Sequence, residues 1–125
     1  MSTPAPGSLV GTNLSILVGS LNRPPELRAL SSGDQLVSLD VTVRPPGAPA
    51  ESVPVAWPSA PKAATSWPPG EEVLVVGRVR RRFFRAGGIT QSRTEVVASV
   101  AVPTRRAAQV RRAVRAALAA VDRQL

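Results

Sequence analysis

Side chains of different character alternate over the long stretch between residues 72 and 102, and this pattern predicts one long β-hairpin. Valine and glycine occupy one face of its first strand. Because the side chains of a strand point to alternate faces, three arginines and a phenylalanine follow two apolar residues on the other face. This basic row consists of Arg78, Arg80, Arg82 and Phe84. Gly87 and Gly88 permit the positive φ values of a tight turn at the tip.

The returning strand, residues 89–102, is predicted to have one apolar and one polar face as well. Its apolar face contains Thr94, Val96, Ala98, Val100 and Val102. Its polar face contains Arg93, Glu95 and Ser99. The hairpin is therefore expected to bury one continuous side and to present a basic side to solvent.

Three shorter strands and two helices are predicted around this hairpin. The strands cover residues 13–21, 35–43 and 52–57. Two prolines stop the first strand, so residues 22–28 are predicted to form a turn. Ser59 is expected to cap a brief helix over residues 60–67, and Thr104 is expected to cap a helix that runs to the last residue.

This order of elements is that of a five-stranded OB-fold barrel with a short helix between its third and fourth strands. Strand propensity alone also permits a small β-sandwich. The predicted fold class is therefore an all-β core, as an OB-fold barrel, with an added C-terminal α-helix. The expected organisation is a flexible N-terminal arm at 1–12, an OB-fold domain at 13–103 and a basic amphipathic helix at 104–125.

The charge of the chain indicates an anionic partner. Its 125 residues carry a net charge of +8, and arginine supplies every basic residue except Lys62. Nucleic acid is the commonest partner of such a chain, and arginine favours bidentate phosphate contacts and stacking. Charged residues on a strand can instead protect a sheet edge from pairing with other chains. The arginine run between residues 78 and 85 exceeds what that protection needs, which favours nucleic acid.

The composition argues against an enzyme. The chain has no cysteine and no histidine, which excludes disulfides, thiol catalysis, histidine-dependent triads and the usual transition-metal ligands. Its carboxylates are scattered, and it has no phosphate-cradling glycine motif. Neither a secretory signal nor an apolar run of about 18 residues is present. A soluble, cytoplasmic, nucleoid-associated protein without metal or cofactor is expected.

The predicted C-terminal helix combines an apolar stripe with many arginines. The stripe contains Val110, Val114, Leu118, Val121 and Leu125. Because the stripe is narrow and rich in valine, docking on the domain or on a second subunit is favoured over insertion into a membrane. The arginines either extend a nucleic-acid surface or keep the helix soluble, and the pattern does not separate these alternatives.

Several short segments follow one another in a specific order. They are Asn13-Leu-Ser-Ile-Leu-Val-Gly-Ser-Leu21, Arg23-Pro-Pro-Glu-Leu-Arg28, the Ser-Gly turn at 32–33, and residues 53–57, 70–79 and 94–98. Together these segments resemble the bacterial single-stranded DNA-binding protein family. Each segment is weak alone, but in this order they cover the chain from residue 13 to residue 102 with few gaps.

The resemblance implies an OB domain that binds single-stranded DNA without sequence preference, usually as a homotetramer built from dimers. In that family, aromatic side chains stack on bases and basic residues hold the phosphates. By position, Trp57 and Phe84 match two of the stacking residues. The basic contacts expected beside the hairpin row are Arg44, Arg85 and Arg93.

Each aromatic residue also has a packing interpretation. Trp57 has valine neighbours and fits a core position as well as a stacking position. Trp67 follows the predicted short helix and is expected to plug the barrel. Phe83 falls on the face opposite Phe84 and is expected to pack or to contact another subunit.

Two features depart from the family. Aromatic residues expected near Pro45–Gly47 and Glu51 are missing, which implies weaker binding with a larger, salt-sensitive electrostatic share. A basic helix stands where the family has an acidic tip, which implies an accessory paralogue in DNA replication, recombination or repair. The alternative is an OB-fold protein-interaction module of the primosomal or conjugation accessory type, whose partner is a replication or repair protein.

Overall fold

The computed structural model of the protein describes residues 11–125, and this part of the chain is mostly β-structure. The strands are β1 (Ser15–Leu21), β2 (Glu26–Ala29), β3 (Gln35–Val43), β4 (Glu51–Trp57), β5 (Glu72–Ala86) and β6 (Ile89–Pro103). The helices are the 3-10 helix η1 (Lys62–Ser66), between β4 and β5, and α1 (Ala107–Asp122), after β6. Most of the predicted N-terminal arm, residues 1–10, lies outside the described residues.

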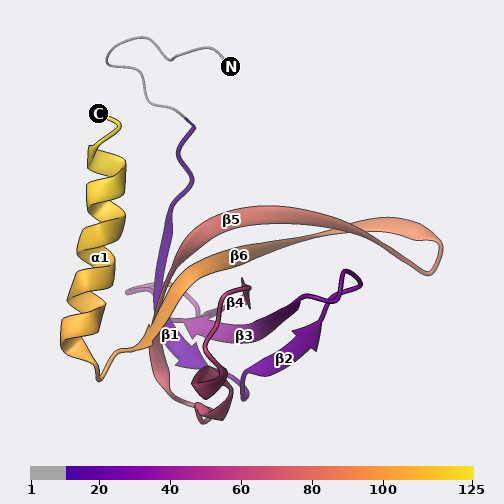
Figure 1. Ribbon diagram of the computed structural model, residues 1–125, viewed down its shortest axis with the longest axis horizontal. Coiled ribbons are helices and arrows are strands. Elements are labelled where there is room, and N and C mark those ends of the chain that lie inside the picture. The colour runs from indigo at the N-terminus through magenta and orange to yellow at the C-terminus, as the bar shows by residue number, and fades with distance from the viewer. Residues whose placement is uncertain (1–10) are drawn as a thin grey trace.

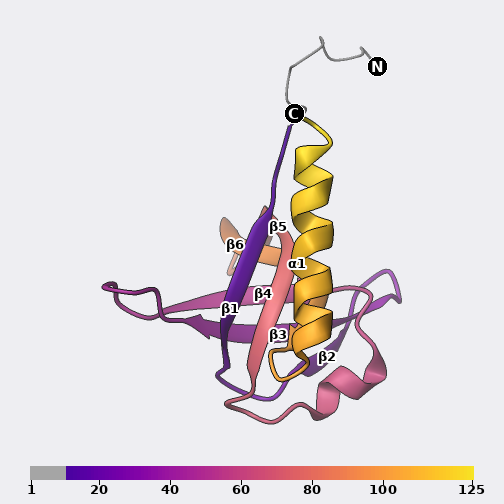
Figure 2. The same cartoon turned by 90° about the vertical axis from the view of Figure 1, so that its left-hand side faces the viewer.

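The strands of this region form one mixed sheet with the order β1-β5-β6-β4-β3-β2. β4 and β6 run parallel, and the other neighbours run antiparallel. The sheet curls until β1 also pairs with β3, at Leu21 opposite Val41. Five strands thereby make a near-closed ring, and β2 extends the sheet beyond β3. Figures 1 and 2 show the long hairpin leaving this ring and α1 standing outside it.

The hydrophobic core fills the ring because the strands turn their apolar positions inward. The inward positions of β3 are Val37, Leu39 and Val41, each at most 2% exposed. η1 adds the fully buried Ala64 to this core. The rings of Trp57, at the end of β4, and Trp67, after η1, lie 5.8 Å apart. Trp67 is 7% exposed, so its predicted role in the core is confirmed.

The turn predicted over residues 22–28 is only partly correct, because the chain resumes extended structure at Glu26. The two prolines do end β1, since proline lacks the N–H that a sheet ladder needs. After them, β2 pairs antiparallel with β3, and Leu27 lies opposite Val37. All the side chains of β2 are exposed. The strand has no buried apolar row, so an alternating hydrophobic pattern could not predict it. It forms because its backbone pairs with the free edge of β3.

Both helices begin later than predicted, and neither has the side-chain cap that the sequence suggested. η1 follows Pro61 and not the predicted cap Ser59. α1 begins after Arg106, again without a capping side chain. Thr104, the predicted cap, instead donates its hydroxyl to the Glu72 carboxylate at 2.6 Å. This contact between the end of β6 and the start of β5 replaces the local cap.

A β-bulge at Ser99 divides the long hairpin. Val76 and Gly77 are consecutive in β5, but their partners in β6 are separated by Ser99, which is left unpaired in the ladder. The Ser99 hydroxyl donates to the Val76 carbonyl oxygen at 3.1 Å. Glycine is required at 77, because a Cβ there would lie 2.2 Å from the carbonyl oxygen of Val97.

The bulge reverses the faces of β6, so the single apolar face predicted for this strand is wrong. Val96 and Ala98 point into the ring and belong to its core. Val100 and Val102 lie on the opposite face, and Val100 packs with Val76 toward α1. One extra residue shifts the period-two pattern by one position. Hydrophobicity does not reveal the shift, because valine suits both faces.

α1 packs against its own domain, on the outside of β5 and β6 (Figure 2). The residues in this contact are Leu74, Val76, Val100, Val110, Ala113, Val114 and Ala117. Where α1 begins, Arg105 Nε donates to Glu71 Oε1 at 3.0 Å. Leu118 and Leu125 of the apolar stripe remain 54% and 76% exposed, so the helix buries only part of the stripe. Among the described residues, no helix is both long and apolar enough to span a membrane.

Candidate nucleic-acid interface

The candidate interface begins where the long hairpin leaves the ring. Within the described residues, β1 pairs with β5 only as far as Gly77, and β4 pairs with β6 only from Val96. Beyond these points β5 and β6 pair only with each other, up to the turn at Gly87 and Gly88, whose φ values are +58° and +77°. We call residues 80–95 the arm and the remainder of β5 and β6 the base. The arm projects to the side away from α1 (Figure 1).

Glu95 holds two arginines of the arm. Its side chain is 7% exposed, and its two oxygens accept from Arg80 Nη2 at 2.7 Å and from Arg82 Nε at 3.1 Å. The arginine side chains remain 37% and 49% exposed. Charge-assisted hydrogen bonds of these lengths fix the orientation of a guanidinium group. The exposed N–H groups of both arginines are therefore oriented so that they can donate to an anion. Glu95 offsets one of the two positive charges.

The two phenylalanines of the arm have different surroundings. Phe84 is half-buried, and the Arg82 guanidinium carbon lies 5.4 Å from its ring centroid, a cation–π distance. Phe83 lies on the other face and is 67% exposed. Phe83 is therefore no packing residue within the domain, and its ring is accessible to a ligand or to another subunit.

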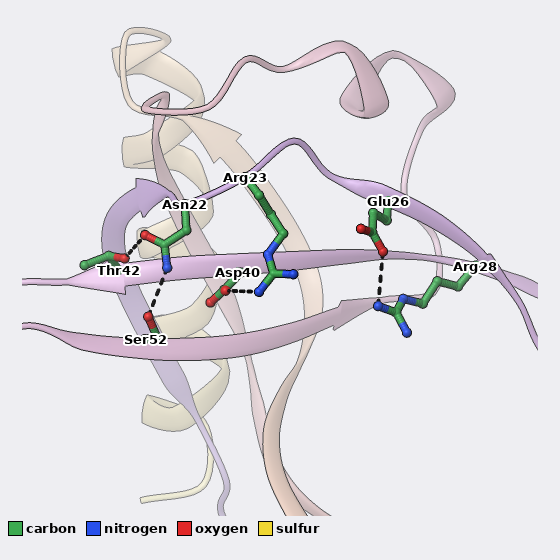
Figure 3. Close-up of polar contacts among 7 residues, drawn as sticks. All are labelled: Asn22, Arg23, Glu26, Arg28, Asp40, Thr42 and Ser52. Atoms are coloured by element: carbon green, nitrogen blue, oxygen red, sulfur yellow. Dashed lines mark hydrogen bonds and ion pairs between the residues drawn. The ribbon is translucent and has the colours of Figure 1, made fainter.

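Arg93 connects the arm with the outer face of β3. It borders a small cavity of about 110 Å³ with Arg23, Glu26, Arg28, Ser38, Leu39 and Asp40. Arg23 Nη2 donates to Asp40 Oδ2 at 2.9 Å (Figure 3). Arg28 Nη2 donates to Glu26 Oε2 at 3.1 Å. The basic face thus continues from the arm to the segment between β1 and β3.

Arg23 and Arg28 are site residues that the sequence reasoning missed. They flank the proline pair and are distant in sequence from the arginine run. The usable signal is the alternation in Glu26-Leu27-Arg28-Ala29, which places Arg28 on the polar face once these residues are recognised as a strand.

Asn22 holds this segment in place beside the ring. The Thr42 hydroxyl donates to Asn22 Oδ1, and Asn22 Nδ2 donates to Ser52 Oγ at 2.9 Å (Figure 3). One side chain after β1 is therefore bonded to β3 and β4 together. This network orients the chain that carries Arg23 over the outer face of β3.

Three further arginines predicted for the site are exposed but have different neighbours. Arg85 donates to the Gly88 carbonyl oxygen at 2.6 Å, so it braces the tip of the arm. Arg44 lies one residue past β3, in the loop to β4. Arg78 lies at the root of the arm and lines a groove beside α1. Arg80, Arg82 and Phe84 are thus the predicted residues that the structure links by direct or shared contacts.

Trp57 does not have an exposed ring. Its side chain is 4% exposed, belongs to the core of the ring and packs on Trp67. Base stacking needs an accessible aromatic face. The geometry therefore corrects the expectation that Trp57 stacks on a base and favours its alternative role in the core.

Comparisons with known proteins identify no relative: no protein-family model matches the chain, and no curated protein matches it significantly.

Proposed function

We propose that the protein binds single-stranded DNA without sequence preference on this basic face, and that it does so without catalysis. The observation that carries the proposal is the surface from the arm to β2, on which five arginines outnumber three carboxylates, with the Phe84 ring among them; the arginines are Arg80, Arg82, Arg93, Arg23 and Arg28. Alternate residues of a strand are about 7 Å apart, a spacing that suits a phosphate backbone. An aromatic ring beside such a row offers a base a stacking partner.

The ring of strands supports an OB-fold for this protein. The order β1-β5-β6-β4-β3, closed by the β1–β3 pairing and with η1 between β4 and β5, is expected of a five-stranded, partly open barrel. OB-folds bind oligonucleotides on the face of their second and third strands and with two loops. Here those parts correspond to β3 and β4, to the segment that carries Arg23 and Arg28, and to the arm. The basic residues lie along these parts.

Self-association as a dimer or tetramer is part of the proposal. Leu14, just before β1, and Ile16 and Val18 in β1 form an apolar row, and these residues are 37%, 37% and 48% exposed. This row lies on the face of the sheet that α1 covers only in part, and exposed apolar residues of this kind favour contact with a second copy. We expect Val18→Glu to lower the molar mass measured by size-exclusion chromatography with light scattering. An unchanged mass above that of the monomer would place the contact elsewhere.

An OB-fold protein-interaction module, with a replication or repair protein as partner, is the second candidate. The burial of Trp57 favours it, because that ring is lost to base stacking. A salt titration separates the candidates. Electrostatic binding of nucleic acid weakens steeply with salt, whereas an apolar protein interface does not.

Fluorescence anisotropy of a labelled poly-dT oligonucleotide tests the proposal, with duplex DNA as competitor and at low and moderate salt. We expect preference for the single strand and a negative slope of about 0.7 per phosphate contact in a double-logarithmic salt plot. Phe84→Ala should weaken binding by about tenfold, because stacking is worth roughly 1–3 kcal/mol per base. Because backbone and stacking contacts carry little information about the sugar, poly-rU of equal length is measured in parallel.

A matched pair of arginine variants gives the control. Arg93→Ala, in the arm, should reduce the salt slope by about 0.7. Arg115→Ala removes the same charge from α1, on the side away from the arm, and should leave the slope nearly unchanged (Figure 1). Equal affinity for duplex, or equal losses in the two variants, would contradict the proposal and favour the protein-interaction module.

A further inference from the structure

An apolar groove of about 940 Å³ runs beside the contact between α1 and the outer face of the sheet. Its sheet side includes Val76, Val97 and Val102, and its helix side includes Ala113, Ala116 and Ala120. The groove forms because the hairpin curves away while α1 continues straight beside β1 (Figures 1 and 2). Alanine side chains are too short to fill the resulting space. The groove is large enough to hold a ligand of several side chains, since binding pockets span roughly 300–1,000 Å³.

The groove is apolar inside and positively charged at its walls. Arg78 from the sheet and Arg112 from α1 line it, and no carboxylate lines it in the described part of the chain. The ion pairs found within residues 11–125 engage other arginines, which leaves these two guanidinium groups without a carboxylate partner there. A charge beside an apolar surface interacts more strongly with a counter-charge than one in open water.

We propose that this groove binds an acidic peptide segment of another protein. Apolar side chains of the segment would enter between the valines and the alanines, and its carboxylates would pair with Arg78 and Arg112. The inference does not depend on nucleic-acid binding by the arm, because the groove lies on the side of the molecule where α1 stands (Figure 1).

The chemistry of the lining selects this occupant over two others. A nucleic acid would bring phosphates to the arginines, but its bases would meet aliphatic side chains, since no aromatic residue lines the groove in the described part of the chain. A second copy seated on the groove by a twofold axis would bring its own Arg78 and Arg112 toward the same arginines, and like charges at an interface cost several kcal/mol. An acidic, partly apolar peptide can pair its carboxylates with the two arginines and can bury its apolar side chains between the valines and the alanines.

Fluorescence anisotropy with a synthetic probe tests the inference. The probe is a fluorescein-labelled peptide in which aspartate alternates with leucine and phenylalanine, and its control replaces each aspartate with asparagine. We expect saturable binding of the acidic probe and at least about tenfold weaker binding of the control, because charge-assisted contacts are lost. Failure of the acidic probe to bind, or equal binding of both peptides, overturns the inference.

Two matched pairs of variants on α1 separate groove binding from the general positive charge of the protein. Arg112→Glu should weaken probe binding by about tenfold, whereas Arg111→Glu, next to it but outside the groove, should change it by no more than about twofold. Ala116→Trp fills the groove and should abolish binding. Ala119→Trp, an exposed position outside the groove, should not.

Circular dichroism and light scattering complete the test. All four variants should keep the helical signal and the thermal transition of the parent, because the substituted positions are exposed. Equal losses in the two arginine variants would show nonspecific attraction and overturn the inference. A change of oligomeric state in Ala116→Trp, absent in Ala119→Trp, would assign the groove to a second copy and would also overturn it.

Discussion

The base and the arm belong to one β-hairpin, yet their surroundings are opposite. In the base, Leu74 and Val75 are 1% and 0% exposed on opposite faces, the first against α1 and the second inside the ring. In the arm, Phe83 and Ile89 are 67% and 65% exposed, and the buried residue is the charged Glu95. A continuous hydrogen-bonded ladder therefore does not assign a role to its residues. The role of each residue depends on which element covers its face of the ladder.

The Ser99 bulge lies in the base, where the hairpin changes its role. Between the bulge and the start of α1, apolar residues of the core cover one face of the ladder, and apolar residues of α1 cover the other. Beyond the end of the ring, the same two strands carry charge and aromatic rings into solvent. Substitutions in the base should consequently change the stability of the protein, and substitutions in the arm should change its binding of nucleic acid.

Leu74→Ala should have the largest effect. Leu74 is almost fully buried between β5 and α1, and truncation of a buried leucine costs about 2–5 kcal/mol of the free energy of unfolding. Urea denaturation followed by circular dichroism measures this loss. The affinity of the folded variant for poly-dT should equal that of the parent. A large loss of affinity without a loss of stability would break the division between base and arm.

Glu95→Gln should change both quantities. Stability should fall by about 1–3 kcal/mol, because two arginines lose a buried carboxylate but remain partly hydrated. The salt dependence of poly-dT binding should become steeper by up to about 1 unit of slope, because one negative charge leaves the basic face. Glu51→Gln, at an exposed carboxylate, is the control. A shallower slope would mean that Glu95 serves binding mainly by orienting the arginines.

Ser99→Ala should have the smallest effect. It removes the hydrogen bond from the bulge to Val76, which is worth about 0.5–1.5 kcal/mol of unfolding free energy. Thermal or urea denaturation measures the change. Ser92→Ala, on the exposed arm, should cost less, and neither variant should alter poly-dT binding. A binding defect in Ser99→Ala alone would show that the bulge sets the direction of the arm.

Much of the fold was predictable because its strongest strands are locally periodic. The prediction of residues 35–43 matches β3 at both ends, since apolar and polar residues alternate strictly from Val37 to Val43. The hairpin and its double-glycine tip are also as predicted. β2 was not predictable in this way, because its pairing with β3 depends on an edge that exists only after the sheet has formed.

The sequence predicted which residues of β5 share the basic face of the candidate site. It did not predict which residues of other segments contact them. Arg80, Arg82 and Phe84 share one face as the alternation predicts. Their link to Glu95 depends on which residues of β6 lie opposite β5, and the turn sets that register, because the pairing runs without a shift from Ala86 to Gly77. The burial of Trp57 depends likewise on Trp67, which arrives from a different element.

The sequence by itself determined the period-two strands, the glycine tip and the basic row, because these follow from the backbone geometry of neighbouring residues. Only the tertiary structure decided which faces are covered. It turned Val100 and Val102 toward α1, buried Trp57, joined Arg23 and Arg28 to the arm through Arg93, and left a groove beside the alanines of α1. The physical reason is that burial and cross-strand register depend on residues that are far apart along the chain.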